Sequence, residues 1–162
     1  MKGQLPLDYV IALLLFIVFI GFIFIQSRTY TPTYLRELRL QKLRAEAYQI
    51  SEMLINDQGE PSNWESSQDV KRIGFASNSY QLNNLSMAKI RKFNTICKGF
   101  NGYANATSLI ATENDFALII RNETTVLVNC TSPNAPKALA AEIVRIVYFD
   151  DRTYGMLSLK IW

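Results

Sequence analysis

VIALLLFIVFIGFIFI, residues 10–25, is an unbroken apolar run that decides the architecture of this chain. With Tyr9 it would form a helix about 26 Å long at ~1.5 Å per residue, close to the roughly 30 Å of bilayer hydrocarbon. We therefore expect one transmembrane segment over about residues 9–26. A single carboxylate, Asp8, lies at the edge of the run.

The residues that flank the run differ from those of an ordinary secretory signal peptide. Such a signal ends in small residues beyond its apolar stretch, whereas QSRTY follows this run at residues 26–30. The small residue after which a peptidase could cut is Gly3, before the run. The N-terminus consists of Lys2-Gly3-Gln4, an acidic residue, Asp8, at the fifth position after Gly3, and then a long apolar helix. In these features it resembles the class III signal peptide of archaeal type IV pilin-like proteins.

This resemblance implies cleavage between Gly3 and Gln4 by a prepilin peptidase on the cytoplasmic side, so that residues 1–3 are a leader. Asp8 lies one helical turn beyond Gln4, and a carboxylate facing hydrocarbon is costly unless it is paired. In a filament of bundled helices, the Asp8 of one subunit would pair with the Gln4 amine of its neighbour and set the axial register. The alternative is a hydrated Asp8 in the headgroup zone of an ordinary anchor.

The composition excludes several classes of function. The chain has 162 residues, which leaves room for one domain beyond the helix, and its net charge of +3 comes from scattered residues that form no basic patch, so no nucleic acid partner is expected. Histidine is absent, which removes the commonest general base and metal ligand. Asp150 and Asp151 are adjacent and are best explained as turn formers. We expect no catalysis, no cofactor and no metal.

A second helical stretch follows the membrane segment. Thr31-Pro32-Thr33 predicts a bend or a loosened turn, since proline removes a backbone donor. Beyond it, apolar residues recur at three- and four-residue spacing on one face, which should pack on a sheet; these are Leu40, Leu43, Ala47, Ile50 and Leu54. Turn-forming residues then end the helix, giving a helix over 4–56 and an extracellular domain over 57–162.

The turn after the helix carries a second resemblance to the same family. Archaeal pilin-like proteins often have a Gly-x-Pro-x-x-Trp stretch here, and Gly59-Glu-Pro61-Ser-Asn-Trp64 looks like it. The resemblance implies a structural turn in which Trp64 anchors the loop to the domain. The alternative for Trp64 is a ring that stacks on a ligand.

The rest of the chain predicts one short helix and two hairpins. Ser86 precedes a helix with Met87, Ile90, Phe93 and Cys97 on one side and a solvated basic face of Lys89, Arg91 and Lys92 on the other. Alternation from Phe116 to Ile120, with a turn into 125–129, predicts one hairpin, and 143–149 with 156–162 predicts another. The fold class is therefore α+β: a long N-terminal transmembrane helix extended into a pilin-like domain with a four- to five-stranded antiparallel sheet.

Cysteines and sequons bear on the location of the domain. Cys97 and Cys130 are too far apart in sequence for a close metal-binding pair, and a disulfide between them would stabilise the fold by about 3–4 kcal/mol; two buried free thiols are the alternative. Four tripeptides fit the N-glycosylation pattern, and those at residues 105 and 122 fall in stretches that we interpret as loop and turn. The four acceptors are Asn84, Asn105, Asn122 and Asn129.

One pattern argues for the opposite topology. Basic residues follow the apolar run, a flank that the positive-inside rule would place in the cytoplasm; they are Arg28, Arg36, Arg39, Lys42 and Arg44. We expect the C-terminal domain to lie outside the cell, because the leader, the cysteines and the sequons all indicate that location.

The expected function is that of a major or minor structural subunit of an archaeal type IV pilus-like filament, serving adhesion or surface assembly. Its partners would be the prepilin peptidase, other pilin subunits and, before assembly, membrane lipid. The alternative is a single-pass surface protein that never polymerises and binds a partner or ligand through its β domain.

Overall fold

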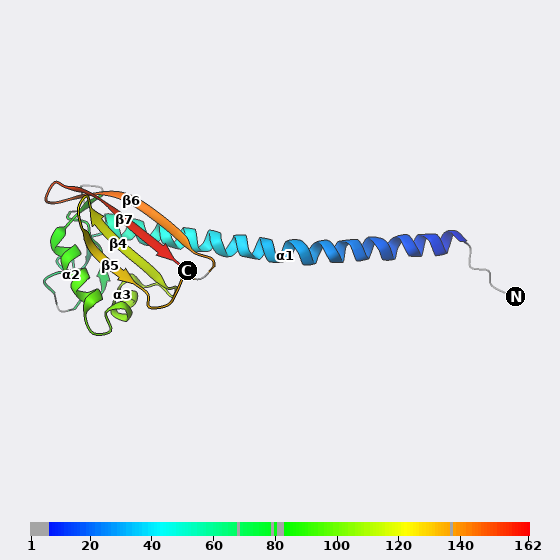
Figure 1. Ribbon diagram of the computed structural model, residues 1–162, viewed down its shortest axis with the longest axis horizontal. Coiled ribbons are helices and arrows are strands. Elements are labelled where there is room, and N and C mark those ends of the chain that lie inside the picture. The colour runs from blue at the N-terminus through cyan, green and yellow to red at the C-terminus, as the bar shows by residue number, and fades with distance from the viewer. Residues whose placement is uncertain (1–6, 68, 79, 81–82, 137) are drawn as a thin grey trace. The chain divides into compact units, whose positions relative to one another are not determined.

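The computed structural model describes residues 7–67, 69–78, 80, 83–136 and 138–162. The chain divides into two compact units, Met1–Arg39 and Leu40–Trp162, each of which is described by itself. Within the described residues the elements follow one another as shown in Figure 1. They are α1 (Leu7–Asn56), β1 (Gly59–Glu60), β2 (Arg72–Ile73), β3 (Asn84–Leu85), α2 (Met87–Lys98), α3 (Gly102–Ile110), β4 (Phe116–Asn122), β5 (Val126–Thr131), β6 (Ala141–Phe149) and β7 (Tyr154–Ile161).

The first unit holds the apolar part of α1. Pro32 lies inside α1 and the helix continues through it. The bend or loosened turn expected at Thr31-Pro32-Thr33 stays a prediction. Proline removes one backbone donor, so the carbonyl of Arg28, four residues earlier, receives no N–H from position 32. The Thr31 hydroxyl donates a 2.6 Å hydrogen bond to the neighbouring carbonyl, that of Ser27.

The second unit is an α+β domain, which confirms the predicted fold class. Its main sheet has five strands in the order β3-β6-β7-β4-β5, and β6, β7, β4 and β5 pair in antiparallel fashion. The sheet is mixed because β3 runs parallel to β6. Sequence periodicity did not predict β3, which is only two residues long. A separate two-stranded sheet joins β1 to β2.

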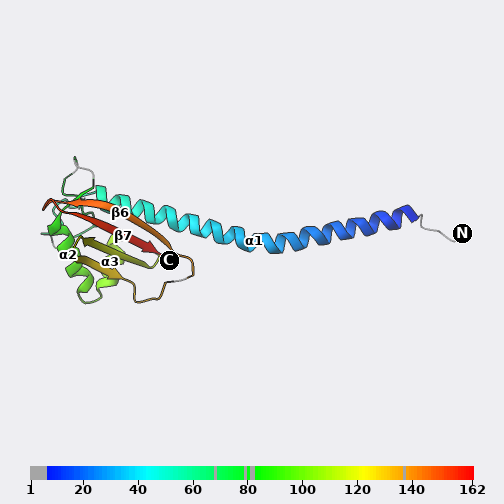
Figure 2. The ribbon, with the colours of Figure 1, turned by 45° about the horizontal axis from the view of Figure 1, so that its top comes forward.

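One face of the main sheet forms the core. On β4 the residues Phe116, Leu118 and Ile120 are fully buried, and Leu157, Leu159 and Ile161 are buried on the neighbouring β7. This is the alternation that predicted the two strands. The residues of α1 from Leu40 onward supply Ala47, Ile50 and Leu54 to the same core, as their spacing predicted. Figure 2 shows β6 and β7 lying along this end of α1.

Helices α2 and α3 complete the core beside β5. Helix α2 was predicted, and its Ile90 and Phe93 are buried. Helix α3 was not predicted, and the expectation that Asn105 lies in a loop or turn is wrong, because Asn105 is inside α3. Ala106 and Ile110 of α3 are buried, so packing of this short apolar stripe outweighs the weak helix propensity of its glycine and asparagine.

Candidate functional site

Helix α1 presents an apolar surface that the first unit leaves uncovered. Its large apolar side chains from Leu7 to Ile25 are 46–73% exposed. Of the helices in the described part of the chain, α1 is the one long and apolar enough to cross a membrane. A helix that is apolar on every side needs lipid or other apolar helices around it. The side chains that form this surface are Leu7, Tyr9, Val10, Ile11, Leu13, Leu14, Leu15, Phe16, Ile17, Val18, Phe19, Ile20, Phe22, Ile23, Phe24 and Ile25.

Asp8 is the one acidic residue of the first turn of α1, and it is exposed. A negative charge is favourable there, because the backbone N–H groups at a helix N-terminus carry partial positive charge. Gly3 and Gln4, the predicted processing site, lie outside the described residues. Cleavage before Gln4 and pairing of its amine with Asp8 therefore stay predictions.

Aromatic and basic side chains mark the other end of the apolar run. The guanidinium of Arg28 lies 4.8 Å from the centre of the Phe24 ring, an arrangement that favours a cation. Tyr30 and Tyr34 follow two and six residues later, and both are exposed. Tyrosines with an apolar ring and a polar tip are typical of membrane–water boundaries. The run thus ends in the kind of residues found where hydrocarbon gives way to water.

Two acidic residues fasten α1 to the domain within the second unit. Glu46 accepts hydrogen bonds from the Thr112 hydroxyl at 2.6 Å and from the Asn114 amide at 2.7 Å. Six residues later, Glu52 forms an ion pair with Arg145 of β6, and the Arg145 guanidinium also lies 4.7 Å from the centre of the Tyr48 ring. These bonds hold α1 beside both β6 and the loop before β4, and they add direction to the apolar packing.

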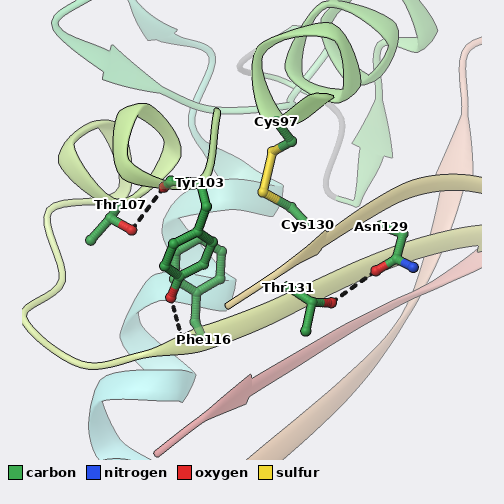
Figure 3. Close-up of a disulfide and its surroundings, with 7 residues drawn as sticks. All are labelled: Cys97, Tyr103, Thr107, Phe116, Asn129, Cys130 and Thr131. Atoms are coloured by element: carbon green, nitrogen blue, oxygen red, sulfur yellow. Dashed lines mark hydrogen bonds between the residues drawn. A yellow bond between two sulfur atoms is a disulfide. The ribbon is translucent and has the colours of Figure 1, made fainter. Parts of the chain in front are cut away.

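A disulfide joins Cys97, in the last turn of α2, to Cys130 of β5, as predicted. Figure 3 shows this bridge next to the stacked rings of Tyr103 and Phe116, whose centres are 5.0 Å apart. The backbone N–H of Phe116 donates a 2.8 Å hydrogen bond to the Tyr103 hydroxyl. The disulfide therefore ties α2 to the edge strand β5, and Tyr103 ties α3 to the start of β4. Disulfides persist in oxidising compartments, in keeping with a domain outside the cytoplasm.

The Gly-x-Pro-x-x-Trp stretch forms a tight turn that buries Trp64. Gly59 has a φ of +85°, and a Cβ there would lie 2.6 Å from Cδ1 of Trp64. The Trp64 side chain is fully buried, and its indole N–H donates a 2.8 Å hydrogen bond to the carbonyl of Gly74. Pro61 closes the turn by accepting a 3.0 Å hydrogen bond from the Trp64 backbone N–H. A ring enclosed in this way has no face free for stacking on a ligand.

Lys89 corrects the expectation of a solvated basic face on α2. It is only 3% exposed, and its ammonium donates to the carbonyls of Gln58 at 2.8 Å and Ala76 at 3.0 Å. Burial lowers the pKa of Lys89 below the ordinary 10.5, while the charges of Glu65 and Asp57 oppose that shift. The spacing held a signal for this, because Lys89 stands four residues before Phe93 and eight before Cys97 on one helix face. Lys89 thus joins α2 to the loops after α1.

The four sequons lie in different settings. Asn84 is half-buried in the short β3, and Asn105 is in α3, where its amide donates a 3.3 Å hydrogen bond to the Phe100 carbonyl. Asn129 is exposed on β5 and accepts a 2.8 Å hydrogen bond from the Thr131 hydroxyl (Figure 3). Asn122 ends β4 in the turn to β5, which agrees with the prediction of a turn there. Modification of any of them stays a prediction.

The adjacent carboxylates of Asp150 and Asp151 accept hydrogen bonds from different parts of the chain. The Asp150 side chain accepts from the backbone N–H of Met87 at the start of α2, whereas Ser86, the residue expected to cap this helix, makes no cap bond with its side chain. Asp151 accepts from the hydroxyl and backbone N–H of Thr153, bonds that hold the pKa of Asp151 below its ordinary value. Across the described ranges, no group of three or more His, Cys, Asp or Glu side chains could hold a metal ion.

Comparison with known proteins does not extend this description. No protein-family model, no curated protein and no solved structure matches the chain. The described chain combines two features, an apolar helix with one carboxylate at its edge and an α+β domain closed by a disulfide.

Proposed function

We propose that this chain is a structural subunit of a type IV pilus-like surface filament, assembled through its apolar N-terminal helix after a prepilin peptidase removes residues 1–3. The observation that carries the proposal is the exposed apolar surface of residues 7–25, bordered by the one carboxylate of Asp8. The folded domain lies outside the cell and serves adhesion or surface assembly, without catalysis.

The apolar surface has two suitable environments in this scheme. Before assembly it lies in membrane lipid, where a helix satisfies its own backbone hydrogen bonds. In the filament, neighbouring subunits supply apolar helices in place of lipid. The energy that holds the subunits together is then close packing of these side chains, and Asp8 adds specificity because its charge is satisfied in only one register.

The second unit supports an exterior position. The bridge between Cys97 and Cys130 suits an oxidising compartment, and saccharides on exposed sequons would be expected there. A domain held by its own core and by a disulfide would also survive outside a cell, where folding helpers are scarce.

The experiment compares three forms of the full chain in its native membranes: wild type, Asp8→Ala and the matched control Asp8→Glu, which keeps the carboxylate. We expect all three to accumulate in membranes at similar levels. Wild type and Asp8→Glu should appear in filaments sheared from the cell surface. The amount of Asp8→Ala recovered in these filaments should be at least tenfold lower.

The mass of the N-terminal peptide gives a second readout. A chain that begins at Gln4 supports processing by a prepilin peptidase. A chain that keeps residues 1–3, or equal recovery of Asp8→Ala in sheared filaments, would contradict the proposal and favour a membrane-anchored surface protein that does not polymerise.

A further inference from the structure

The outer face of the sheet carries an apolar patch that no part of the described chain covers. Ile146 of β6 is 73% exposed and Tyr154 of β7 is 61% exposed. Met156, which pairs with Ile146 across the two strands, lies beside them. Apolar side chains gathered on the surface of a folded domain usually mark a place that something covers. We call these three residues the β6–β7 patch.

Two hollows adjoin at this patch. The first has a volume of about 250 Å³ and is lined by the β6–β7 patch together with four more residues, Arg121, Asn122, Glu123 and Gly155. The second, of about 300 Å³, has a polar lining of Asn122, Glu123, Thr124, Arg152, Thr153 and Tyr154. Asn122, Glu123 and Tyr154 line both. An apolar floor with polar groups at its edge suits an amphipathic occupant.

Asn122 stands at the rim of both hollows and is the acceptor of a sequon, Asn122-Glu-Thr124. Its Oδ1 accepts hydrogen bonds from the backbone N–H groups of Thr124 at 3.1 Å and Thr125 at 2.7 Å, and from the Thr124 hydroxyl at 3.3 Å. Within the described part of the chain, its Nδ2 donates no hydrogen bond. The carbonyl end of the amide is thus held by the turn while the nitrogen stays available.

We propose that Asn122 carries an N-linked saccharide whose first sugars lie over the β6–β7 patch. A pyranose ring is amphipathic: its C–H face packs on Tyr154 and Ile146, and its hydroxyls reach Arg152, Glu123 and Thr124 at the polar edge. The proposal requires the domain to be outside the cytoplasm, but it does not require a filament. Equal recovery of Asp8→Ala in sheared filaments, which would contradict the proposed function, would therefore leave this proposal intact.

The other sequons fit this role less well. Asn84 is half-buried in β3, and the amide nitrogen of Asn105 is engaged with the Phe100 carbonyl. Asn129 is exposed but lines neither hollow. Asn122 alone among the four combines an available amide nitrogen with an apolar surface beside it.

The transfer reaction balances without oxidation or reduction. The donor is a lipid-linked saccharide pyrophosphate, and Nδ2 of Asn122 attacks the anomeric carbon. A C–N bond forms as the C–O bond to the pyrophosphate breaks, the leaving group takes the bonding electron pair, and the amide nitrogen loses one proton. The transferase that binds this donor and Asn122 accepts that proton.

The test uses the full chain made in its native host, with fragmentation mass spectrometry of the tryptic peptide 122–137, which assigns a saccharide either to Asn122 or to Asn129 because that peptide holds both sequons. We expect wild type to carry a saccharide mass on Asn122. Asn122→Gln should lose it, and the matched control Thr124→Ser should keep it, because serine preserves the sequon. An unmodified Asn122 in wild type would overturn the proposal.

A thermal-unfolding cycle tests whether the saccharide lies on the patch. Asn122→Gln should lower the midpoint by about 3–6 °C when Tyr154 is intact and by less than about 1 °C in a Tyr154→Ser background. Equal shifts in both backgrounds would show a saccharide that does not contact the patch. A concentration-dependent dimer of wild type that Ile146→Ser abolishes would assign the patch to a second copy of the chain instead. Either result would overturn the proposal.

Discussion

Asp150 caps a helix that begins 63 residues before it in the sequence: both of its carboxylate oxygens lie 3.2 Å from the backbone nitrogen of Met87. The turn between β6 and β7 thus satisfies one of the first N–H groups of α2, which have no partner within the helix. The sheet and α2 depend on each other through this bond.

Asp150→Ala should lower the free energy of unfolding by about 1 kcal/mol, because it removes the cap and leaves the Met87 N–H without its acceptor. The measurement is urea unfolding of the full chain in detergent micelles, followed by fluorescence of Trp64 and Trp162, which are both buried in the domain. The matched control is Ser86→Ala, which should change the free energy of unfolding by less than about 0.5 kcal/mol. A larger effect of Ser86→Ala than of Asp150→Ala would contradict the assignment of the cap.

Lys89→Met should lower the free energy of unfolding by about 1–3 kcal/mol at neutral pH. Methionine has a side chain of similar length, but it leaves the carbonyls of Gln58 and Ala76 without this donor. Lys98→Met, on the exposed end of the same helix, is the control and should be nearly neutral. The same urea unfolding assay gives both values.

The difference in unfolding free energy between wild type and Lys89→Met should depend on pH in a definite direction. The pKa of Lys89 is lower in the folded chain than its ordinary 10.5, so between the lowered pKa and 10.5 the unfolded chain binds more protons than the folded one. The stability of wild type relative to Lys89→Met should therefore rise with pH across that interval. A relative stability that falls with pH would show that Lys89 holds its proton more tightly in the folded state.

Gly59→Ala should destabilise the domain by more than about 1 kcal/mol, because alanine is strained at a φ of +85° and its Cβ would lie 2.7 Å from the Arg72 carbonyl oxygen. Gly99→Ala is the matched control: Gly99 has a φ of −74°, and its nearest contact would be 3.3 Å. Comparison of the two urea midpoints checks this prediction, and similar midpoints would count against a special role for Gly59.

Replacing both Cys97 and Cys130 by serine should lower the free energy of unfolding by about 3–4 kcal/mol, because the bridge no longer restricts the unfolded chain between them. Reduction of wild type with a thiol reagent should reproduce this loss and should leave the double variant unchanged. A double variant as stable as oxidised wild type would contradict it.

Much of the fold follows from periodicity alone. Apolar residues at every second position predicted β4 and β7, and apolar residues at three- and four-residue spacing predicted the buried face of α1 after Leu40. These signals are local, since each element shows its buried side within its own sequence. The disulfide was predictable as well, because Cys97 and Cys130 are the chain's two cysteines.

The contacts that depend on distant partners were not predictable. Nothing near Asn84 and Leu85 indicates that they pair with Tyr148 and Phe149. The burial of Lys89 depends on two carbonyls brought to it by other segments, and Asp150 was interpreted as a turn former because Met87 is far away in sequence. For the candidate site, the apolar helix was plain from the sequence, while the β6–β7 patch required the strand register.

The bridge between α2 and β5 also sets how the chain would respond to a pulling force. Its two cysteines are 33 residues apart, a stretch that would span roughly 110 Å if fully extended. Tension applied through α1 at one end and β7 at the other passes directly across the sulfur atoms, so this length is never released. A domain pulled open on a surface would lengthen less, retain α3 and β4 inside a closed loop, and have a shorter path back to its folded form.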